Sequence, residues 1–180
     1  IGIARASDSN FNVSEFISNA DIAMYRSKDA GRSTHTVFVP DMMEDNKRRL
    51  LIANSISGAI KHNEFSVHYQ AKVAPDESVV GYEALIRWKS ESLGTVSPAE
   101  FIPIAEQSGK ILSITKWVIK KVCQELDQIL AMHTGKMVVS LNLSAHDIKN
   151  ASLVDYIRAM FDKYRVDTSH IEFEVTESAY

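Results

Sequence analysis

Three strand-like segments of the sequence each carry an oxygen-bearing side chain near their C-terminal end. Glu83 lies in VVGYEALIRWKS, Asn142 in VVSLNLSA and Glu174 in IEFEVTES. Carboxylate and amide oxygens are hard donors, so this set suits Mg²⁺, Mn²⁺ or Ca²⁺ better than zinc. We therefore predict a divalent-cation site at Glu83, Asn142 and Glu174, provided that the three strands lie side by side.

Glu83 and Arg87 place two charges inside a strand with two largely apolar faces, a pattern typical of a strand covered on both sides. They lie about 13 Å apart along an extended chain, too far to neutralise each other, so each needs another partner. A cation shared with Glu174 would satisfy Glu83. Without it, we expect at least one of these carboxylates to have a raised pKa. Arg87, further along the same face, is suited to hold a phosphate oxygen with its planar guanidinium.

A purely structural explanation of these residues stays open at this point. Glu83 could pair with a basic residue on a neighbouring strand, Asn142 could cap a loop, and Glu174 could lie at the solvent edge. Structural ion pairs also occupy such places. Burial requires a partner for each charge and does not identify it.

The alternation of apolar and polar residues predicts the elements that must position these side chains. A strand at 64–73 and the strand at 79–90 flank Pro75 and Asp76, which indicates a hairpin. The order strand, helix, strand, helix, strand after it predicts parallel pairing in an α/β layer or barrel, in which sites form at the C-terminal ends of the strands. The later segments are short and long helices at 97–109 and 114–132, a strand at 136–145, a helix through Leu153 and Tyr164, and a strand at 170–178.

The composition is that of an ordinary globular protein, with 45% hydrophobic and 24% charged residues among 180. The net charge of −3 provides no general basic field, which argues against a nucleic acid polymer as partner. No apolar run approaches the ~18 residues of a membrane helix, and no secretory signal opens the chain. With Cys123 as the single cysteine, a reducing compartment fits best. We expect a cytoplasmic protein, whose parent could be membrane-anchored through upstream domains.

Both ends of the sequence resemble the middle of strands. The chain begins at Ile1 without Met and ends at Tyr180, so we expect a segment of a longer protein. The first forty or so residues are too few to bury a core of their own. We predict three parts: 1–40 as the tail of an earlier domain, 41–62 as a joining helix, and 63–180.

Four motifs occur in order along the chain: YEALIRW, VSPAEFIPIAEQSGKI, LNLSA and FEVTES. In these motifs the sequence resembles the EAL domain of cyclic di-GMP phosphodiesterases. The stretch ADIAMYRSKDAGR, before Pro40, resembles the C-terminal tail of a GGDEF domain. The resemblance implies a TIM-like (β/α)8 barrel of EAL type, of which about the first half is present, with a short α+β GGDEF tail at the N-terminus.

The resemblance also implies roles for individual residues. Glu83, Asn142 and Glu174 match metal ligands, for Mg²⁺ or Mn²⁺, and Glu83 is thereby catalytic. Arg87 matches a residue that touches a substrate phosphate, and Gln70 falls in a stretch near the substrate.

Glu177 matches a glutamate, counted here with the catalytic residues, that steadies the loop at the metal site and at a dimer contact. A homodimer through the EAL domain is therefore implied. Ala71 departs from the family pattern, which commonly has proline there, and Ser90 with Glu91 replaces a common His-Pro pair.

The implied activity is hydrolysis of cyclic di-GMP to linear pGpG by a metal-activated water in bacterial second-messenger signalling. The alternative is a catalytically inactive receptor that binds cyclic di-GMP. A third possibility, an unrelated metal-dependent TIM-barrel enzyme, explains one motif rather than four. The family's paired metal-binding aspartates would follow Tyr180, so we predict that the 180-residue chain alone is inactive.

Overall fold

The computed structural model describes residues 1–133 and 137–175. The chain divides into two compact units, Ile1–Ile52 and Ala53–Tyr180, and helix α2 (Asp41–Lys61) runs across the division. In the described part of the chain, no helix combines the length and the apolar character needed to cross a membrane.

The first unit is a helix against a small parallel sheet. Strand β1 (Gly2–Ile3) pairs with β2 (Thr36–Val37), after the 3-10 helix η1 (Ala6–Ser9) and helix α1 (Val13–Asp29). Helix α1 begins where the Asn12 side chain accepts a hydrogen bond from the Glu15 amide, a common N-terminal cap. Its buried Ser27 hydroxyl lies 2.7 Å from the Ile1 carbonyl oxygen and so ties the helix to the strand. The strand-like character of the sequence at Ile1 agrees with β1, which begins at Gly2.

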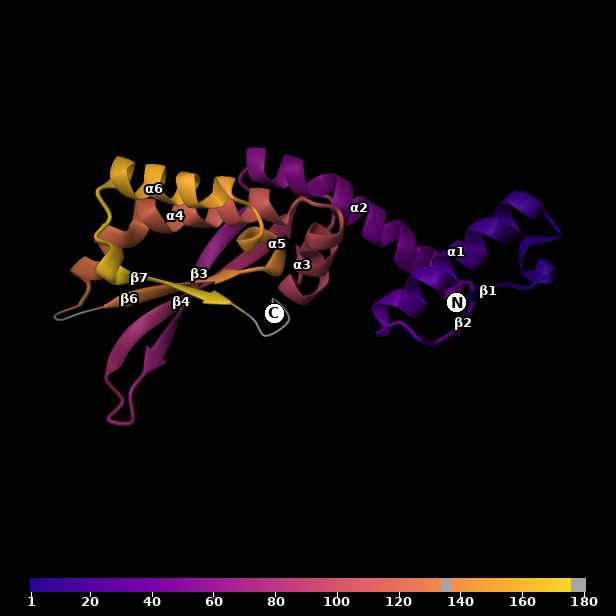
Figure 1. Ribbon diagram of the computed structural model, residues 1–180, viewed down its shortest axis with the longest axis horizontal. Coiled ribbons are helices and arrows are strands. Elements are labelled where there is room, and N and C mark those ends of the chain that lie inside the picture. The colour runs from indigo at the N-terminus through magenta and orange to yellow at the C-terminus, as the bar shows by residue number, and fades with distance from the viewer. Residues whose placement is uncertain (134–136, 176–180) are drawn as a thin grey trace. The chain divides into compact units, whose positions relative to one another are not determined.

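The second unit contains a five-stranded mixed sheet in the order β3-β4-β6-β7, with β5 also paired to β4 (Figure 1). The predicted hairpin is formed by β3 (Phe65–Val73) and β4 (Val79–Ser90), which pair antiparallel. As predicted, β6 (Val138–Leu143) pairs parallel with β4, and β7 (Ile171–Val175) parallel with β6. Strand β5 (Gly94–Val96) was not predicted, because three residues are too few to show an alternation.

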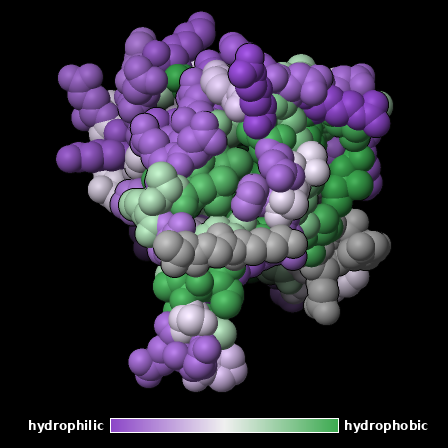
Figure 2. All heavy atoms as spheres, turned by 90° about the vertical axis from the view of Figure 1, so that its left-hand side faces the viewer, coloured by the Kyte–Doolittle hydropathy of each residue, from purple (hydrophilic) through white to green (hydrophobic). Residues whose placement is uncertain are grey.

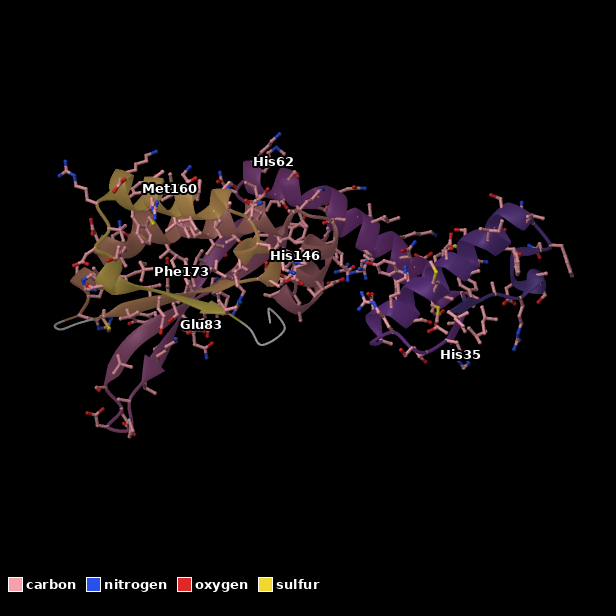
Figure 3. The ribbon with its side chains drawn as sticks, viewed as in Figure 1. His35, His62, Glu83, His146, Met160 and Phe173 are labelled. Carbon is pink, nitrogen blue, oxygen red and sulfur yellow. The ribbon has the colours of Figure 1, made fainter. Side chains whose placement is uncertain are left out.

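Helices cover one face of this sheet, along which α4 and α6 lie (Figure 1). Between the helices and the sheet, Val122 and Leu126 of α4 belong to one buried cluster with Val139 and Leu141 of β6. Figure 3 shows Phe173 on this side of the sheet and Glu83 on the opposite side. The helices are α3 (Pro98–Gln107), α4 (Ile111–Ala131), α5 (Ala145–Ile148), α6 (Ser152–Tyr164) and the 3-10 helix η2 (Thr168–His170).

The expectation that β4 is covered on both faces is wrong for the residues described here. Ala84, Ile86 and Trp88 are buried on the helix side, whereas Glu83 and Arg87 are only half-buried. The second face is less protected because α4 and α6 lie along the other face (Figure 1). Apolar residues on a strand face indicate which surface avoids water in the complete fold, but they do not identify what covers it.

The β3–β4 hairpin projects beyond the sheet. Its stem exposes apolar side chains, with Val73 62% and Val80 47% accessible, and its tip is hydrophilic (Figure 2). Asp76 shapes the turn by accepting hydrogen bonds from the amide and the hydroxyl of Ser78, at 3.1 and 2.6 Å. In the described residues, β3, β7 and the short β5 each pair with one neighbouring strand only.

Candidate active site

Strand register places the predicted site residues on one face of the sheet. Directly paired residues on neighbouring strands point to the same side, so a row of partners forms a strip across the sheet. Asn142 of β6 pairs with Glu174 of β7 near the C-terminal ends of these strands. Two residues earlier on β6 and β7, a second row crosses the same face of the sheet and consists of Gln70, Glu83, Ser140 and Glu172.

Asn142 is the partner that Glu83 requires. The Asn142 side-chain nitrogen Nδ2 donates a hydrogen bond to Glu83 Oε1 at 2.7 Å. Two of the three predicted metal-binding side chains are therefore in direct contact. Gln70 lies directly opposite Glu83 on β3, where its side chain is exposed.

The partner of Glu174 is Lys72, a residue with no role predicted from the sequence. The Lys72 ammonium forms an ion pair with Glu174 Oε1 and donates a hydrogen bond to Ser140 Oγ at 2.6 Å. The signal for Lys72 was present, because alternation along β3 places it on the same strand face as Gln70. Its partner lies two strands beyond β4, and the sequence alone does not show that a side chain from β3 reaches so far.

The expected rise in a carboxylate pKa is wrong for Glu174. The hydrogen bond from Lys72 holds the pKa of Glu174 below its usual value, and the same contact raises the pKa of Lys72. The prediction assumed a dry site without a local cation. Instead the Glu174 side chain is 35% accessible and has an ammonium beside it, and both features favour the ionised carboxylate.

Arg87 lies four residues beyond Glu83 along β4, at the C-terminal edge of the parallel strands. Its guanidinium Nη1 donates to the Ile86 carbonyl oxygen at 3.0 Å. Arg87 also lines a cavity of about 250 Å³ together with Asn142, Asp147 and apolar side chains of α3 and α4. Arg87 and Asn142 therefore border the same cavity.

The loop after Asn142 is held by a buried carboxylate, that of Asp147, for which the sequence predicts no function. Asp147 is 1% accessible, and its Oδ2 accepts hydrogen bonds from Thr115 Oγ1 at 2.9 Å and Ser144 Oγ at 2.7 Å. Ser144 and Asp147 form a capping box that starts α5. These bonds tie the end of β6, and so Asn142, to helix α4.

The donor set fits a hard divalent cation in its chemistry. Glu83 and Glu174 supply carboxylate oxygens and Asn142 an amide oxygen, and Mg²⁺ takes about six oxygen ligands, of which several are commonly waters. Within the residues described, no three His, Cys, Asp or Glu side chains are grouped closely enough to hold a metal by themselves. Glu177, the remaining predicted site residue, lies outside the described residues.

Comparison with known proteins places this chain in a family. The family model for the EAL domain matches residues 53–180. The chain is 34% identical to the bifunctional diguanylate cyclase/cyclic di-GMP phosphodiesterase MucR of Pseudomonas aeruginosa over 179 residues, which cover 99% of this chain and 26% of that protein. It is 29% identical to the cyclic di-GMP phosphodiesterase PdeR of Escherichia coli, over 99% of this chain and 27% of that protein.

A solved structure has the same fold. The MucR phosphodiesterase in complex with c-di-GMP superposes with a TM-score of 0.67 at 33% identity, covering 72% of this chain and 53% of that one. The second unit is therefore a mixed α/β domain of EAL type. The chain belongs to the EAL domain family, and the resemblance drawn from the four motifs is confirmed at that level. It spans about a quarter of the length of the two curated relatives.

Proposed function

We propose that this chain is the N-terminal part of an EAL domain that hydrolyses cyclic di-GMP to linear pGpG. The observation that carries the proposal is the contact between Glu83 and Asn142 on the sheet face that also carries Glu174. The names of MucR and PdeR supply the substrate class, since both include cyclic di-GMP phosphodiesterase. The solved MucR domain holds c-di-GMP itself.

The organisation of the parent protein follows as part of the same proposal. Residues 1–40 are the tail of a GGDEF domain, 41–62 form the first EAL helix, and 63–180 form about half of a TIM-like barrel. The alignments with MucR and PdeR support it, because they run over 99% of this chain, including its first unit. The match to 53% of the solved MucR domain agrees with half a barrel. We propose a cytoplasmic location for the domain and a homodimer in the parent.

The chain's own residues have separate tasks in this reaction. Glu83, Asn142 and Glu174 hold a divalent cation, Mg²⁺ or Mn²⁺, and Arg87 holds a phosphate oxygen of the substrate. When bound, such a cation supplies Lewis acidity at phosphate oxygen and lowers the pKa of water. Gln70, exposed opposite Glu83, is placed to contact the substrate from β3. Glu177 is proposed to support the neighbouring loop.

A cyclic di-GMP receptor without catalytic activity is the second candidate. The ion pair between Lys72 and Glu174 favours it, because an ammonium already neutralises one of the proposed metal-binding carboxylates. The two functions differ in whether the bound nucleotide is consumed, and in whether a metal is needed.

The deciding experiment uses the full-length protein with cyclic di-GMP in Mn²⁺ and in EDTA, with nucleotides separated by liquid chromatography. Production of pGpG that requires Mn²⁺ supports the phosphodiesterase. Binding without consumption, measured by calorimetry, supports the receptor, and absence of both contradicts the two proposals together. The isolated 180-residue chain is expected to produce no pGpG, because about half of the proposed barrel is absent from it.

A further inference from the structure

The Lys72 ammonium lies inside a group of carboxylates. Besides its ion pair with Glu174 and its hydrogen bond to Ser140, its nitrogen is 3.8 Å from Glu172 Oε2. The negative charge of Glu83 also acts on it and helps to raise its pKa. One positive charge therefore faces three negative ones, which leaves this face of the sheet attractive to a further cation.

The position of the ammonium is set by contacts to two strands. Ser140 Oγ donates a hydrogen bond to Glu172 Oε2 at 2.8 Å, so its hydroxyl proton is engaged and its lone pairs can accept from Lys72. Lys72 itself lies opposite Gly81, which has no side chain to obstruct the path over β4. The side chain thus extends from β3 to acceptors on β6 and β7.

We propose that Lys72 is a tethered cation that competes with the divalent metal for Glu174. The inference rests on the proposed function, because it requires Glu174 to be a metal ligand. A carboxylate oxygen that faces an ammonium at ion-pair distance has no room to coordinate a metal on the same side. Binding of the metal therefore requires the ammonium to leave Glu174, and the free energy of this displacement lowers the affinity of the protein for the metal.

The side chain is built to make that movement. Lys72 and Glu174 are 37% and 35% accessible, so the ammonium can turn towards water without an uncompensated burial of charge. Its four-carbon stem is flexible, and the charge lies at the very end. Part of the metal affinity is lost to displacing this group, and without it the carboxylates would bind a divalent cation more tightly.

The test measures Mn²⁺ binding directly, from the electron paramagnetic resonance signal of free Mn²⁺ titrated with the full-length protein. Lys72→Met and Lys72→Gln remove the charge. We expect each to tighten Mn²⁺ binding about tenfold, the effect of one charge at a partly exposed site. Lys72→Arg keeps the charge and should bind as the wild type does or more weakly. Lys120→Met is the matched control, because Lys120 is exposed on α4, across the sheet from Lys72, and its loss should leave the affinity for Mn²⁺ unchanged.

Glu174→Gln separates failure of this inference from failure of the proposed function. If Glu174→Gln weakens Mn²⁺ binding but neither Lys72→Met nor Lys72→Gln tightens it, competition by Lys72 is disproved and the metal site stands. If Glu174→Gln leaves binding unchanged, Glu174 is no ligand and both proposals fall. Thermal unfolding shows whether each variant folds. If one of Lys72→Met and Lys72→Gln does not fold, the other still tests the proposal.

Discussion

Asn142 and Glu83, 59 positions apart in the sequence, are joined by a hydrogen bond from Nδ2 to Oε1 of 2.7 Å. The bond crosses from β6 to β4 on the face opposite the helices, and it fixes which way the Asn142 amide points. With its nitrogen on Glu83, the amide directs its carbonyl oxygen away from that carboxylate. The two residues therefore form one unit, and changing either should disturb the other.

Replacing Glu83 by Gln should reduce the hydrolysis of cyclic di-GMP by more than about 100-fold, because even the outer partners of metal ligands cost 10–100-fold when changed. The measurement is the initial rate of pGpG formation by the full-length protein in Mn²⁺. Glu77→Gln, at the exposed tip of the hairpin, is the matched control and should retain full activity. Hydrolysis at the wild-type rate in Glu83→Gln would remove Glu83 from the site.

Replacing Arg87 by Ala should chiefly raise KM, by about tenfold or more, because a charge-assisted hydrogen bond to phosphate is lost. Arg87→Lys keeps the charge but lacks the planar guanidinium, so its KM should lie between that of the wild type and that of Arg87→Ala. Lys89→Ala, an exposed cation on the same strand, is the control. A KM unchanged in Arg87→Ala would argue against a phosphate contact.

Replacing Glu64 by Gln should lower stability at pH 7 by about 1 kcal/mol, since its carboxylate accepts a hydrogen bond from the Trp88 indole at 2.9 Å. This bond holds the pKa of Glu64 below its usual value of 4.5. Because the pKa of Glu64 is lower in the folded than in the unfolded protein, its carboxylate stabilises the fold at any pH above the unfolded-state pKa. This stabilisation is lost as the pH falls through the folded-state pKa. Urea unfolding followed by tryptophan fluorescence should show the difference at pH 7 and its decline in acid. An equal difference in unfolding free energy between wild type and Glu64→Gln at pH 7 and in acid would contradict a lowered pKa for Glu64.

The Cys123 thiol should resist modification in the folded protein. Burial raises its pKa to about 11, so at pH 8 about one thiol in a thousand is the reactive thiolate. The side chain is also buried within α4. Reaction with a disulfide reagent at pH 8 should be slow until urea unfolds the chain. Rapid reaction under native conditions would show that the helix layer opens readily.

Replacing Gly81 by Ala should destabilise the sheet by about 1–3 kcal/mol, the usual cost of forcing extra atoms into a packed site. A Cβ there would lie 2.6 Å from the Val138 carbonyl oxygen, which is backbone and cannot move aside alone. Gly58→Ala, in helix α2, is the control, because its added Cβ meets nothing closer than 3.9 Å. Equal midpoints of urea unfolding for wild type and Gly81→Ala would show that β4 and β6 can separate without cost.

Local patterns were sufficient for much of the second unit. The strand at 79–90 was predicted with the bounds that the structure shows, and the hairpin and the parallel order of β4, β6 and β7 are confirmed. Alternation also placed Glu83 on the face opposite Ala84 and Ile86, and their burial agrees. These features depend on residues close in sequence, which is why the sequence reveals them.

Contacts between distant strands escaped the same reasoning. The sequence predicts a raised pKa for at least one of Glu83 and Glu174, whereas the pKa of Glu174 is lowered by Lys72, 102 positions earlier in the chain. The hydrogen bonds that hold Asp147 likewise join it to Thr115, 32 positions away. Each depends on the lateral order of strands and helices, which periodicity does not specify.

The sequence by itself determined the kinds of side chain present, the faces that they occupy and the motifs that indicate the EAL family. The tertiary structure decided which of those side chains touch: Asn142 with Glu83, and Lys72 with Glu174. The physical reason is that a strand's alternation is fixed by its own backbone geometry, whereas the partner of a charge is fixed by register across a sheet whose strands come from far apart in the chain.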